Sequence, residues 1–555
     1  MDQILSKHNA IMKKYLSKHS IMSYLTALAI LLTFSCKEET KREEAKASTA
    51  SNIASSEVML TKQMPDAETS IFDWAKTQTP FKSGGFKPAA VTMNTRFGKL
   101  EFPGGYPTEE TIQKVYDELD LQKATQLYLS MYPALSMKGM IEGVVRDYGT
   151  HSSSHIAVSA DRLDSKALWL TGNTESIYSM VVFDLKADGP TVFEVPGGLM
   201  GPVDDANFKF LFDIGPTGMD KGKGGKYLIL PPDYEGDVPE GYFVFKSPTY
   251  RVFSFVRANA ADIGFGEGAM DYFREGCKIY PLSTGPRENT YRNVTGVPIN
   301  TLVPEDARAF AWMHELINYE PADAFGKERL GELASIGIEK GKPFNPDERM
   351  QRILAKAAEQ GVAMSRVIAF NTRVENAKVY PDRNWESPYV INNSTFYEND
   401  YINLEARTVF HFTADGITPA MAMQMPEGLG SRYQTTYKDS DDNFFDGNKT
   451  YKLNMPPGVP VKLFWSVTVY DNLNRCVVNT MPYPSISSQQ TPPPVTNDDG
   501  SIDIYFSVKQ PAGVEKQNWV EVIPDQGFFV YIRYYGPLNA FNNKTWVPND
   551  VDLVK

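Results

Sequence analysis

The sequence predicts a mainly β protein with a helical insert, because the spacing of its apolar residues changes along the chain. Between residues 167 and 258, short aromatic and β-branched runs alternate with turns that contain Gly and Pro, as in an antiparallel β-sandwich. From residue 303 to 373 apolar residues recur at helical spacing, and strand-like runs return after residue 408. Aromatic residues make up 12% of the 555 residues, which also favours strands.

The overall composition is that of a globular protein, with 42% hydrophobic and 22% charged residues. This balance excludes a collagen-like, coiled-coil or fully disordered chain. At roughly 100–200 residues per domain, the length predicts three or four domains. The net charge is −12 and no dense basic stretch occurs, so we expect no nucleic-acid partner.

The N-terminus has the pattern of a secretory signal. Lys13, Lys14 and Lys18 precede an apolar run from Ile21 to Phe34. As a helix this run would rise about 21 Å, which is too short for a hydrocarbon core of about 30 Å. Cys36 follows the small residue Ser35, as in a bacterial lipobox, although an ordinary signal with an incidental cysteine remains the alternative. We expect residues 1–35 to be a signal peptide and Cys36 to be lipidated.

The residues after Cys36 predict an anchored envelope protein. Lys37-Glu38-Glu39 resembles the acidic export tag of surface lipoproteins in Bacteroidetes-type bacteria. Residues 36–70 are rich in Ala, Ser, Thr, Glu and Lys, which favours a flexible lipidated tether. We therefore expect a Gram-negative outer-membrane protein, periplasmic or surface-exposed, that contacts the membrane through its lipid anchor alone.

The remaining chain divides into four parts by its patterning. We expect a mainly helical segment at 71–150, a β-sandwich at 151–300, a helical domain at 301–375 and a second β domain at 376–555. In the first part, Thr108 opens a helix that is predicted to stop before Pro133. In the third, Asn345-Pro346-Asp347-Glu348 resembles a capping box and predicts a helix with Pro346 at its first position. Residues 408–413 are predicted to be the first strand after this helical region.

Several long motifs resemble a pair of bacterial families, in the order in which those families occur. The first set resembles the domain of unknown function 1254, and the second resembles the domain of unknown function 1214. The motifs of the first set are Gly218–Pro231, Gly241–Arg251, Ser335–Gly337 and Gly341–Pro346; those of the second are Phe464–Asp471, Tyr535–Leu538 and Lys544–Trp546.

This resemblance covers roughly residues 95–555 and implies an architecture. It implies an immunoglobulin-like β-sandwich, a small α-helical domain and a C-terminal jelly-roll β-sandwich. It implies no activity, because neither family has an assigned one.

The C-terminal domain holds the first group of candidate ligand-binding residues. Flat aromatic faces beside forked polar donors are how β-sandwiches hold sugars. The residues that suggest such a surface are Trp465, Arg475, Asn518, Trp519 and Arg533. The alternative is that the rings fill the core and that the arginines pair with carboxylates, since one face of each strand must point inward.

A second group of candidates lies in the N-terminal β domain. Asn173, Glu175 and Tyr178 form a cluster of polar and aromatic residues within a short span. We consider them a second candidate ligand site. Their alternative role is to build a turn.

A calcium site is the one metal site that the sequence suggests. Asp439, Asp441 and Asn443 place oxygen ligands at alternating positions, as calcium loops do. The closing Glu of an EF-hand is absent, so a solvated turn is the alternative. No other cofactor is evident.

Three function classes remain open at this point. The first is a protein that binds a glycan or another small polar ligand outside the cell. The second is a hydrolytic enzyme for such a ligand, although no Gly-x-Ser-x-Gly motif occurs. The third is a structural envelope protein that forms homo-oligomers.

The lipid anchor gives a direct test. The variant Cys36→Ser should move the protein from the membrane fraction to the soluble fraction, because it removes the thiol that carries the lipid. Cell fractionation followed by immunoblotting measures this. Unchanged membrane association would contradict the anchor.

Overall fold

The structure, a computed structural model, describes residues 90–555. The expected signal peptide of residues 1–35, the tether of residues 36–70 and the lipidation site at Cys36 lie outside the described residues. Within the described residues, no helix is both long and apolar enough to cross a bilayer. The prediction of several β-sheets with helices between them is confirmed.

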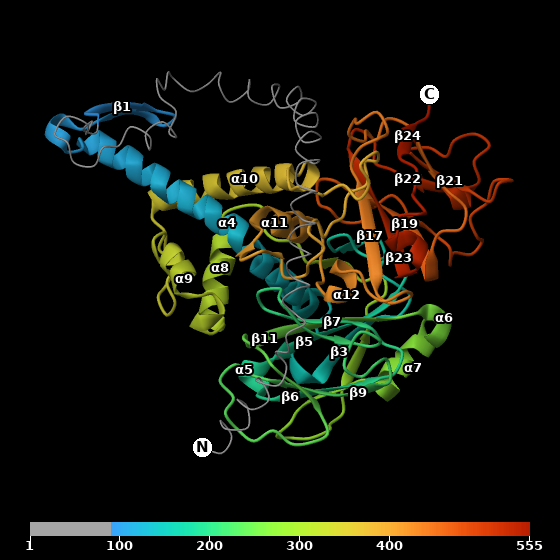
Figure 1. Ribbon diagram of the computed structural model, residues 1–555. Helices are drawn as coiled ribbons and strands as arrows, with labels where there is room; N and C mark the ends of the chain where they lie inside the picture. The colour runs from blue at the N-terminus through green and yellow to red at the C-terminus, as the bar shows by residue number, and fades with distance from the viewer. Residues whose placement is uncertain (1–89) are drawn as a thin grey trace, which may run out of the picture. The chain divides into compact units, whose positions relative to one another are not determined.

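Two sheets form the first β part, which spans residues 155–293 (Figure 1). Their facing sides bury one apolar core, which includes Val158, Phe193 and Ile229. The larger sheet has the order β13-β3-β5-β11-β7-β8, with β3 His155–Ser159, β5 Ile177–Asp184, β7 Gly201–Asp205, β8 Phe210–Ile214, β11 Arg251–Ala258 and β13 Thr290–Asn293. The smaller has the order β10-β9-β6-β12, with β6 Thr191–Pro196, β9 Gly224–Leu230, β10 Phe243–Lys246 and β12 Lys278–Pro281.

Strand β5 is buried on both of its faces. Alternate residues of a strand point to opposite sides, and here Val181 and Phe183 join the core between the two sheets. Met180 and Val182 join a second core, on the outer face of the larger sheet. The sequence Ile-Tyr-Ser-Met-Val-Val-Phe has no exposed residue in the structure. A further layer of structure must therefore cover the outer face of this sheet.

Helix α4, Glu109–Asp147, supplies part of that layer. Thr108 caps it by accepting a hydrogen bond from the backbone amide of Thr111, as predicted. The prediction that the helix stops before Pro133 is wrong, because the helix continues for 14 further residues. A proline inside a helix costs about 3 kcal/mol. The burial of Met137, Met140 and Val144 in the second core offsets this cost.

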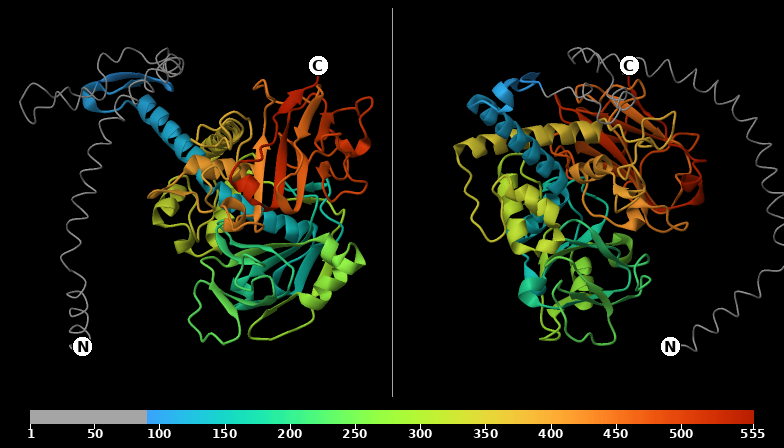
Figure 2. Two further views of the ribbon diagram at one scale, coloured as in Figure 1. Left: turned by 45° about the vertical axis from the view of Figure 1, so that its right-hand side comes forward. Right: turned by 60° about the vertical axis from the view of Figure 1, so that its left-hand side comes forward.

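The other helices gather around α4. In Figure 2, α10 crosses α4, and the two are in direct contact. The predicted helix is present as α10, but it begins two residues later than predicted, because Asp347 caps it by accepting a hydrogen bond from the amide of Met350 and Pro346 lies before the helix. The remaining helices are α5 Leu185–Asp188, α6 Ala260–Ile263, α7 Glu267–Gly276, α8 Arg308–Tyr319, α9 Lys327–Ala334, α10 Glu348–Phe370, α11 Leu404–Thr413, α12 Pro419–Ala422 and α13 Asn539–Asn542.

The prediction of a strand over residues 408–413 is wrong, because these residues form the second half of α11. Asn403 caps this helix by accepting a hydrogen bond from the amide of Ala406. The residues from Val409 to Thr413 are all buried. Alternation of apolar and polar residues predicts a strand only where one face is exposed, so it could not identify the secondary structure here.

Two further sheets form the C-terminal β part. A core that includes Val467, Ile504 and Ile532 lies between them. One sheet has the order β17-β23-β19-β20, with β17 Ser431–Thr436, β19 Val461–Asp471, β20 Ser485–Ser487 and β23 Phe528–Pro537. The other has the order β22-β21-β18-β24, with β18 Tyr451–Met455, β21 Ile502–Ser507, β22 Trp519–Glu521 and β24 Val551–Leu553. Three two-stranded pairs complete the structure: β1 Thr92–Thr95 with β2 Gly98–Glu101, β4 Ala167–Leu168 with β14 Ile299–Asn300, and β15 Tyr397–Glu398 with β16 Tyr401–Ile402.

The contact of α4 with Thr301, the residue after β14, depends on a glycine. A Cβ atom at Gly139 would lie 2.1 Å from the carbonyl oxygen of Thr301, so the close approach needs a residue without a side chain. Gly331 lies in α9, where nothing is within 4 Å of an added Cβ atom. Gly139 and Gly331 therefore form a matched pair for a stability test: both lie in helices, but only Gly139 has a close neighbour at the position of an added Cβ atom.

We expect Gly139→Ala and Gly331→Ala to change stability in opposite directions. Alanine favours a helix over glycine by about 1 kcal/mol, so Gly331→Ala should raise the free energy of unfolding by up to that amount. Gly139→Ala should lower it by about 1–3 kcal/mol, because the backbone must move apart. Denaturant unfolding followed by circular dichroism measures both changes. An increase in stability with Gly139→Ala would show that the contact is not close.

Candidate functional site

A cavity of about 260 Å³ lies where the two β parts meet. One wall is the outer face of the larger N-terminal sheet, near β5, β7 and β11. The opposite wall is the face of β17 and β23 that points away from the C-terminal core. The segment from Ala414 to Met421 closes a third side.

Strand alternation explains why β23 contributes polar residues here. Val530, Ile532 and Tyr534 point into the C-terminal core. Tyr531, Arg533 and Tyr535 therefore point to the other side, where all three line the cavity. On the neighbouring strand β17, Tyr433 lies directly opposite Arg533, and Ser431 lies opposite Tyr535.

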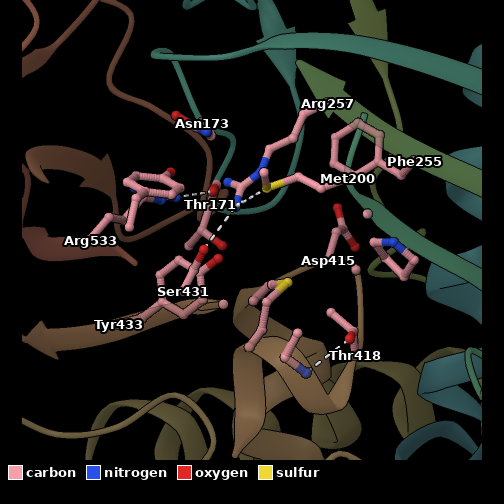
Figure 3. Close-up of a pocket in the computed structure, with 18 of the residues that line it drawn as sticks. Thr171, Asn173, Met200, Phe255, Arg257, Asp415, Thr418, Ser431, Tyr433 and Arg533 are labelled. Atoms are coloured by element: carbon pink, nitrogen blue, oxygen red, sulfur yellow. Dashed lines mark hydrogen bonds between the residues drawn. The ribbon is translucent and has the colours of Figure 1, made fainter. Parts of the chain in front are cut away.

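Arg533 is the more deeply buried of two arginines in the cavity, with 4% of its surface exposed. One guanidinium nitrogen, Nη2, donates to the carbonyl oxygen of Thr171 at 2.5 Å (Figure 3). The other terminal nitrogen, Nη1, is buried and has no hydrogen-bond partner among the described residues. No described carboxylate lies within ion-pair distance of Arg533. Nη2 also lies 3.5 Å from the carbonyl oxygen of Gly172, so the charge is buried with two backbone carbonyl partners and aromatic rings around it.

Arg257 reaches the same cavity from the N-terminal β part. It lies on β11 opposite Tyr178 of β5. Its Nη2 donates to the hydroxyl of Ser431 at 2.8 Å, and its guanidinium lies 4.6 Å from the ring centre of Tyr535. Like Arg533, it forms no ion pair with a described carboxylate. Figure 3 shows both guanidinium groups on the same side of the cavity, close to Thr171.

Stacked aromatic rings form the wall beside these arginines. The ring of Phe255 stacks between Tyr178, at 4.3 Å, and Trp169, at 4.9 Å. Tyr389 and Phe410 stack on each other at 4.5 Å and line another part of the wall. Such rings give a large apolar contact area with few rotatable bonds.

Two aspartates lie in the cavity lining, Asp213, which is buried, and Asp415, which is half-buried. Both oxygens of Asp415 accept hydrogen bonds, one from the hydroxyl of Ser136 and one from the amide of Leu170. Burial raises the pKa of Asp415 to about 7, although Arg475 opposes this shift. Burial also raises the pKa of Asp213.

The cavity brings together residues from both groups that the sequence singled out. Arg533 belongs to the C-terminal group, and Asn173 and Tyr178 belong to the N-terminal group. The side-chain amide of Asn173 donates to the hydroxyl of Tyr178 at 3.0 Å. Asn173 also accepts from the amide of Glu175, so it builds a turn while it lines the cavity.

The two tryptophans and Asn518 do not line this cavity. Trp465 is 6% exposed and belongs to the C-terminal core, which was the alternative that the sequence left open. Trp519 is half-buried, and its indole nitrogen donates to Ser507. Asn518 is buried and its side chain exchanges two hydrogen bonds with the backbone of Val495. These side chains hold the C-terminal part together.

Arg475 and Glu175 link separate parts of the chain. Arg475 is 1% exposed, forms an ion pair with Glu305 at 2.6 Å and donates to the carbonyl oxygen of Phe412. The carboxylate of Glu175 accepts a hydrogen bond from Ser485 of β20. Neither residue lines the cavity, so their contacts are structural.

The candidate calcium residues form a turn in the structure. One oxygen of Asp439 accepts hydrogen bonds from the backbone amides of Asp441, at 3.0 Å, and Asn443, at 2.9 Å. Asp439 is buried, whereas Asp441 and Asn443 are exposed. Across residues 90–555, no three His, Cys, Asp or Glu side chains gather as a metal site requires. Calcium at this turn stays a prediction.

Sequence reasoning missed Arg257, Asp213 and Tyr433. Arg257 follows the apolar run Val252–Val256, so a charged residue near the end of a buried strand was the available signal. Asp213 gives the same signal near the end of β8. No signal in the sequence shows that these strands meet β17 and β23.

A second and larger cavity, of about 990 Å³, lies beside β17. Tyr433 lines both cavities. Many polar groups of the second cavity are already bonded within the chain, such as Lys378 to Asn384 and Arg432 to Asn392. We therefore consider the first cavity the better candidate site.

Comparisons with known families agree with the two β parts. Residues 154–281 match the family described as "Protein of unknown function (DUF1254)", and residues 430–539 match "Protein of unknown function (DUF1214)". The chain therefore contains both domains, and the predicted pairing is confirmed. Tyr178 and Arg257 come from the first matched range, and Tyr433 and Arg533 come from the second.

Two solved structures are similar to this chain over most of its length. One is the VPA0106 protein from Vibrio parahaemolyticus, at 18% identity and a TM-score of 0.47, covering 79% of this chain and 100% of its own. The other is an uncharacterized protein from Burkholderia cenocepacia, at 10% identity and a TM-score of 0.35, covering 80% and 97% respectively. No protein with a curated description matches the chain.

The raised pKa of Asp415 predicts a pH dependence of stability. The folded protein holds a proton on Asp415 that the unfolded chain releases between about pH 4 and about pH 7. The unfolded state therefore binds fewer protons in this range, and the free energy of unfolding falls as the pH rises. We expect Asp415→Asn to reduce this slope, because the amide does not titrate and can still bond Ser136 and Leu170.

Denaturant unfolding at several pH values between about 4 and about 8 measures the slope. Burial also raises the pKa of Glu320 and of Glu386 to about 7. Both residues still contribute to the pH slope in the Asp415→Asn variant, so the slope should decrease but not vanish. The exposed substitution Asp237→Asn is the control. Equal slopes for Asp415→Asn and the unsubstituted chain would contradict the assignment.

Proposed function

We propose that this protein binds a small organic acid in the cavity between its two β parts. The observation that carries the proposal is the pair of arginines, Arg257 and Arg533, which lie in one cavity with no described carboxylate to pair with either. The anionic group of the ligand would lie against these two guanidinium groups, both of which line the cavity. Arg533 Nη1 is itself enclosed and has no hydrogen-bond partner among the described residues, so the charge of Arg533 is incompletely compensated within the chain.

The energetic argument concerns buried charge. Removing a guanidinium from water costs several kcal/mol unless an anion or enough acceptors compensate for it. The carbonyl oxygens of Thr171 and Gly172, to which Arg533 donates, and the rings around its guanidinium give part of this compensation. A carboxylate can accept two parallel hydrogen bonds from one arginine, which gives both affinity and orientation.

The size and walls of the cavity limit the rest of the ligand. At about 30 Å³ for each molecule in liquid water, 260 Å³ equals roughly nine water molecules. The ligand body therefore has about ten non-hydrogen atoms. The aromatic walls favour a ligand with an apolar or ring-shaped body. A sugar acid meets this requirement and also agrees with the glycan ligand that the sequence suggested.

The binding function has more support than the hydrolytic alternative. None of the residues that line the cavity is a histidine, so the hydroxyl of Ser431 has no general base of that type beside it in the described chain. Ser431 instead accepts a hydrogen bond from Arg257. The structural oligomer has no specific observation in its favour.

The proposal includes the finer architecture and the location of the protein. In it, the N-terminal β part is an immunoglobulin-like sandwich and the C-terminal part is a jelly roll, as the family resemblance implies. A lipid on Cys36 and the tether of residues 36–70 would hold the cavity outside the cytoplasm, where small extracellular ligands are available.

Matched acid and neutral compounds test the binding function. We expect phenylacetate to bind more tightly than phenylacetamide, and glucuronate more tightly than glucose, because only the acids compensate the arginines. Arg533→Lys and Arg257→Lys should each weaken the binding acid by about 10- to 100-fold, since lysine keeps the charge and loses the paired donors. Isothermal titration calorimetry measures these affinities.

The control variant is Arg352→Lys, at an exposed position of α10. It should leave the affinity unchanged. If the neutral compounds bind as tightly as the acids, or if neither acid binds, the proposed function is wrong.

A further inference from the structure

Asp213 is a cavity residue to which the proposed acid-binding function gives no role. It lies on β8, and one of its oxygens, Oδ2, accepts hydrogen bonds from the hydroxyl groups of Thr217, at 3.0 Å, and Thr418, at 2.8 Å. The other oxygen, Oδ1, accepts no hydrogen bond from the described residues. Asp213 is 7% exposed, so a buried carboxyl group presents one free acceptor.

Asp213 differs from the other aspartates of this region. Both oxygens of Asp415 are occupied, by Ser136 and Leu170. Asp204 accepts from the amide of Ile417 and does not line the cavity. Asp213 therefore combines a position in the lining with an oxygen that no described residue uses.

Asp213 is held by a residue that lies away from the two arginines in Figure 3. Thr418, whose hydroxyl donates to Oδ2 of Asp213, is drawn at the lower right, whereas Arg533 and Thr171 are drawn further to the left and Arg257 at the top. No described lysine or arginine lies within ion-pair distance of Asp213. The cavity therefore has unpaired cations at one end and an unpaired carboxyl group at the other.

Apolar side chains separate these two ends. Met200, Phe255 and Met421 lie in the cavity lining and offer no charged partner to a ligand. A ligand that meets both ends must carry two polar groups on opposite sides of an apolar body. At one end that group is an anion, and at the other it is a hydrogen-bond donor.

We propose that the ligand is an amino acid in the broad chemical sense, with a carboxylate at Arg257 and Arg533 and a primary amine at Asp213. This inference rests on the proposed acid-binding function and specifies the second end of the ligand. An ammonium group fits better than a hydroxyl, because hydrogen bonds between charged partners are about twice as strong as neutral ones. Burial raises the pKa of Asp213, and a cation beside it would restore the charged form.

Three acids of equal size test the inference. They are 4-(aminomethyl)benzoate, 4-(hydroxymethyl)benzoate and 4-ethylbenzoate, which differ only in the group that would face Asp213. With the full, unsubstituted chain, we expect the aminomethyl compound to bind at least about tenfold more tightly than the ethyl compound. Isothermal titration calorimetry gives the three dissociation constants.

The variant Asp213→Asn locates the effect. Its amide oxygen can accept from Thr217 and Thr418, which places the amide NH₂ toward the ligand, where it cannot accept from an ammonium. We expect the tenfold advantage of the aminomethyl compound to disappear, with the affinity for 4-ethylbenzoate within about twofold of its original value. The exposed substitution Asp237→Asn should change neither affinity. Arg533→Lys should weaken all three compounds by a similar factor.

The outcomes separate the two proposals. If 4-ethylbenzoate binds the unsubstituted chain as tightly as the aminomethyl compound, the proposal that the ligand carries an amine is wrong, and the acid-binding function stands. If the hydroxymethyl compound equals the aminomethyl compound, the donor is a hydroxyl and the amine is again wrong. If none of the three acids binds, the acid-binding function fails as well. The comparison in the unsubstituted chain decides the question even if Asp213→Asn does not fold.

Discussion

The burial of both faces of β5 is the constraint on which the arrangement of the chain depends. A strand with apolar side chains on both sides needs a layer above and a layer below its sheet. The smaller N-terminal sheet gives one layer, and the second half of α4 together with α11 gives part of the other. The C-terminal sheet completes this second layer. The cavity lies between the outer face of the larger N-terminal sheet, which contributes Tyr178 and Arg257, and the C-terminal sheet that covers it.

Two arginines of the C-terminal part show how partners decide the role of a buried charge. Arg475 has an ion pair with Glu305 and donates to two backbone carbonyl oxygens, so its buried charge is compensated within the chain. Arg533 is also buried, but one of its terminal nitrogens has no described partner. Residue type and burial are the same in both cases. The difference lies in what surrounds each guanidinium, which makes Arg475 a structural link and leaves Arg533 free to bind a ligand.

Local signals in the sequence predicted some elements correctly, because the hydrogen bonds concerned are local. Thr108 caps α4 through the amide three residues further on, as predicted. The helix after Asn345 was also predicted, although its cap is Asp347. The helix through Pro133 and the helix over residues 404–413 were missed, since packing against distant elements outweighs their local preferences. Alternation along β23 could identify Arg533 as a residue on one particular face. It could not reveal Arg257 on the other wall, because the two strands pair with different neighbours and meet only through tertiary packing.

The cavity walls come from two separate family-matched ranges of the chain, which has a consequence for the evolution of the gene. The range 154–281 holds Tyr178, Asp213 and Arg257, and the range 430–539 holds Tyr433 and Arg533. A gene that kept one range and lost the other would encode half of the cavity lining and an uncovered apolar sheet face. Selection for a stable fold would therefore act on both ranges together, and against recombination between them.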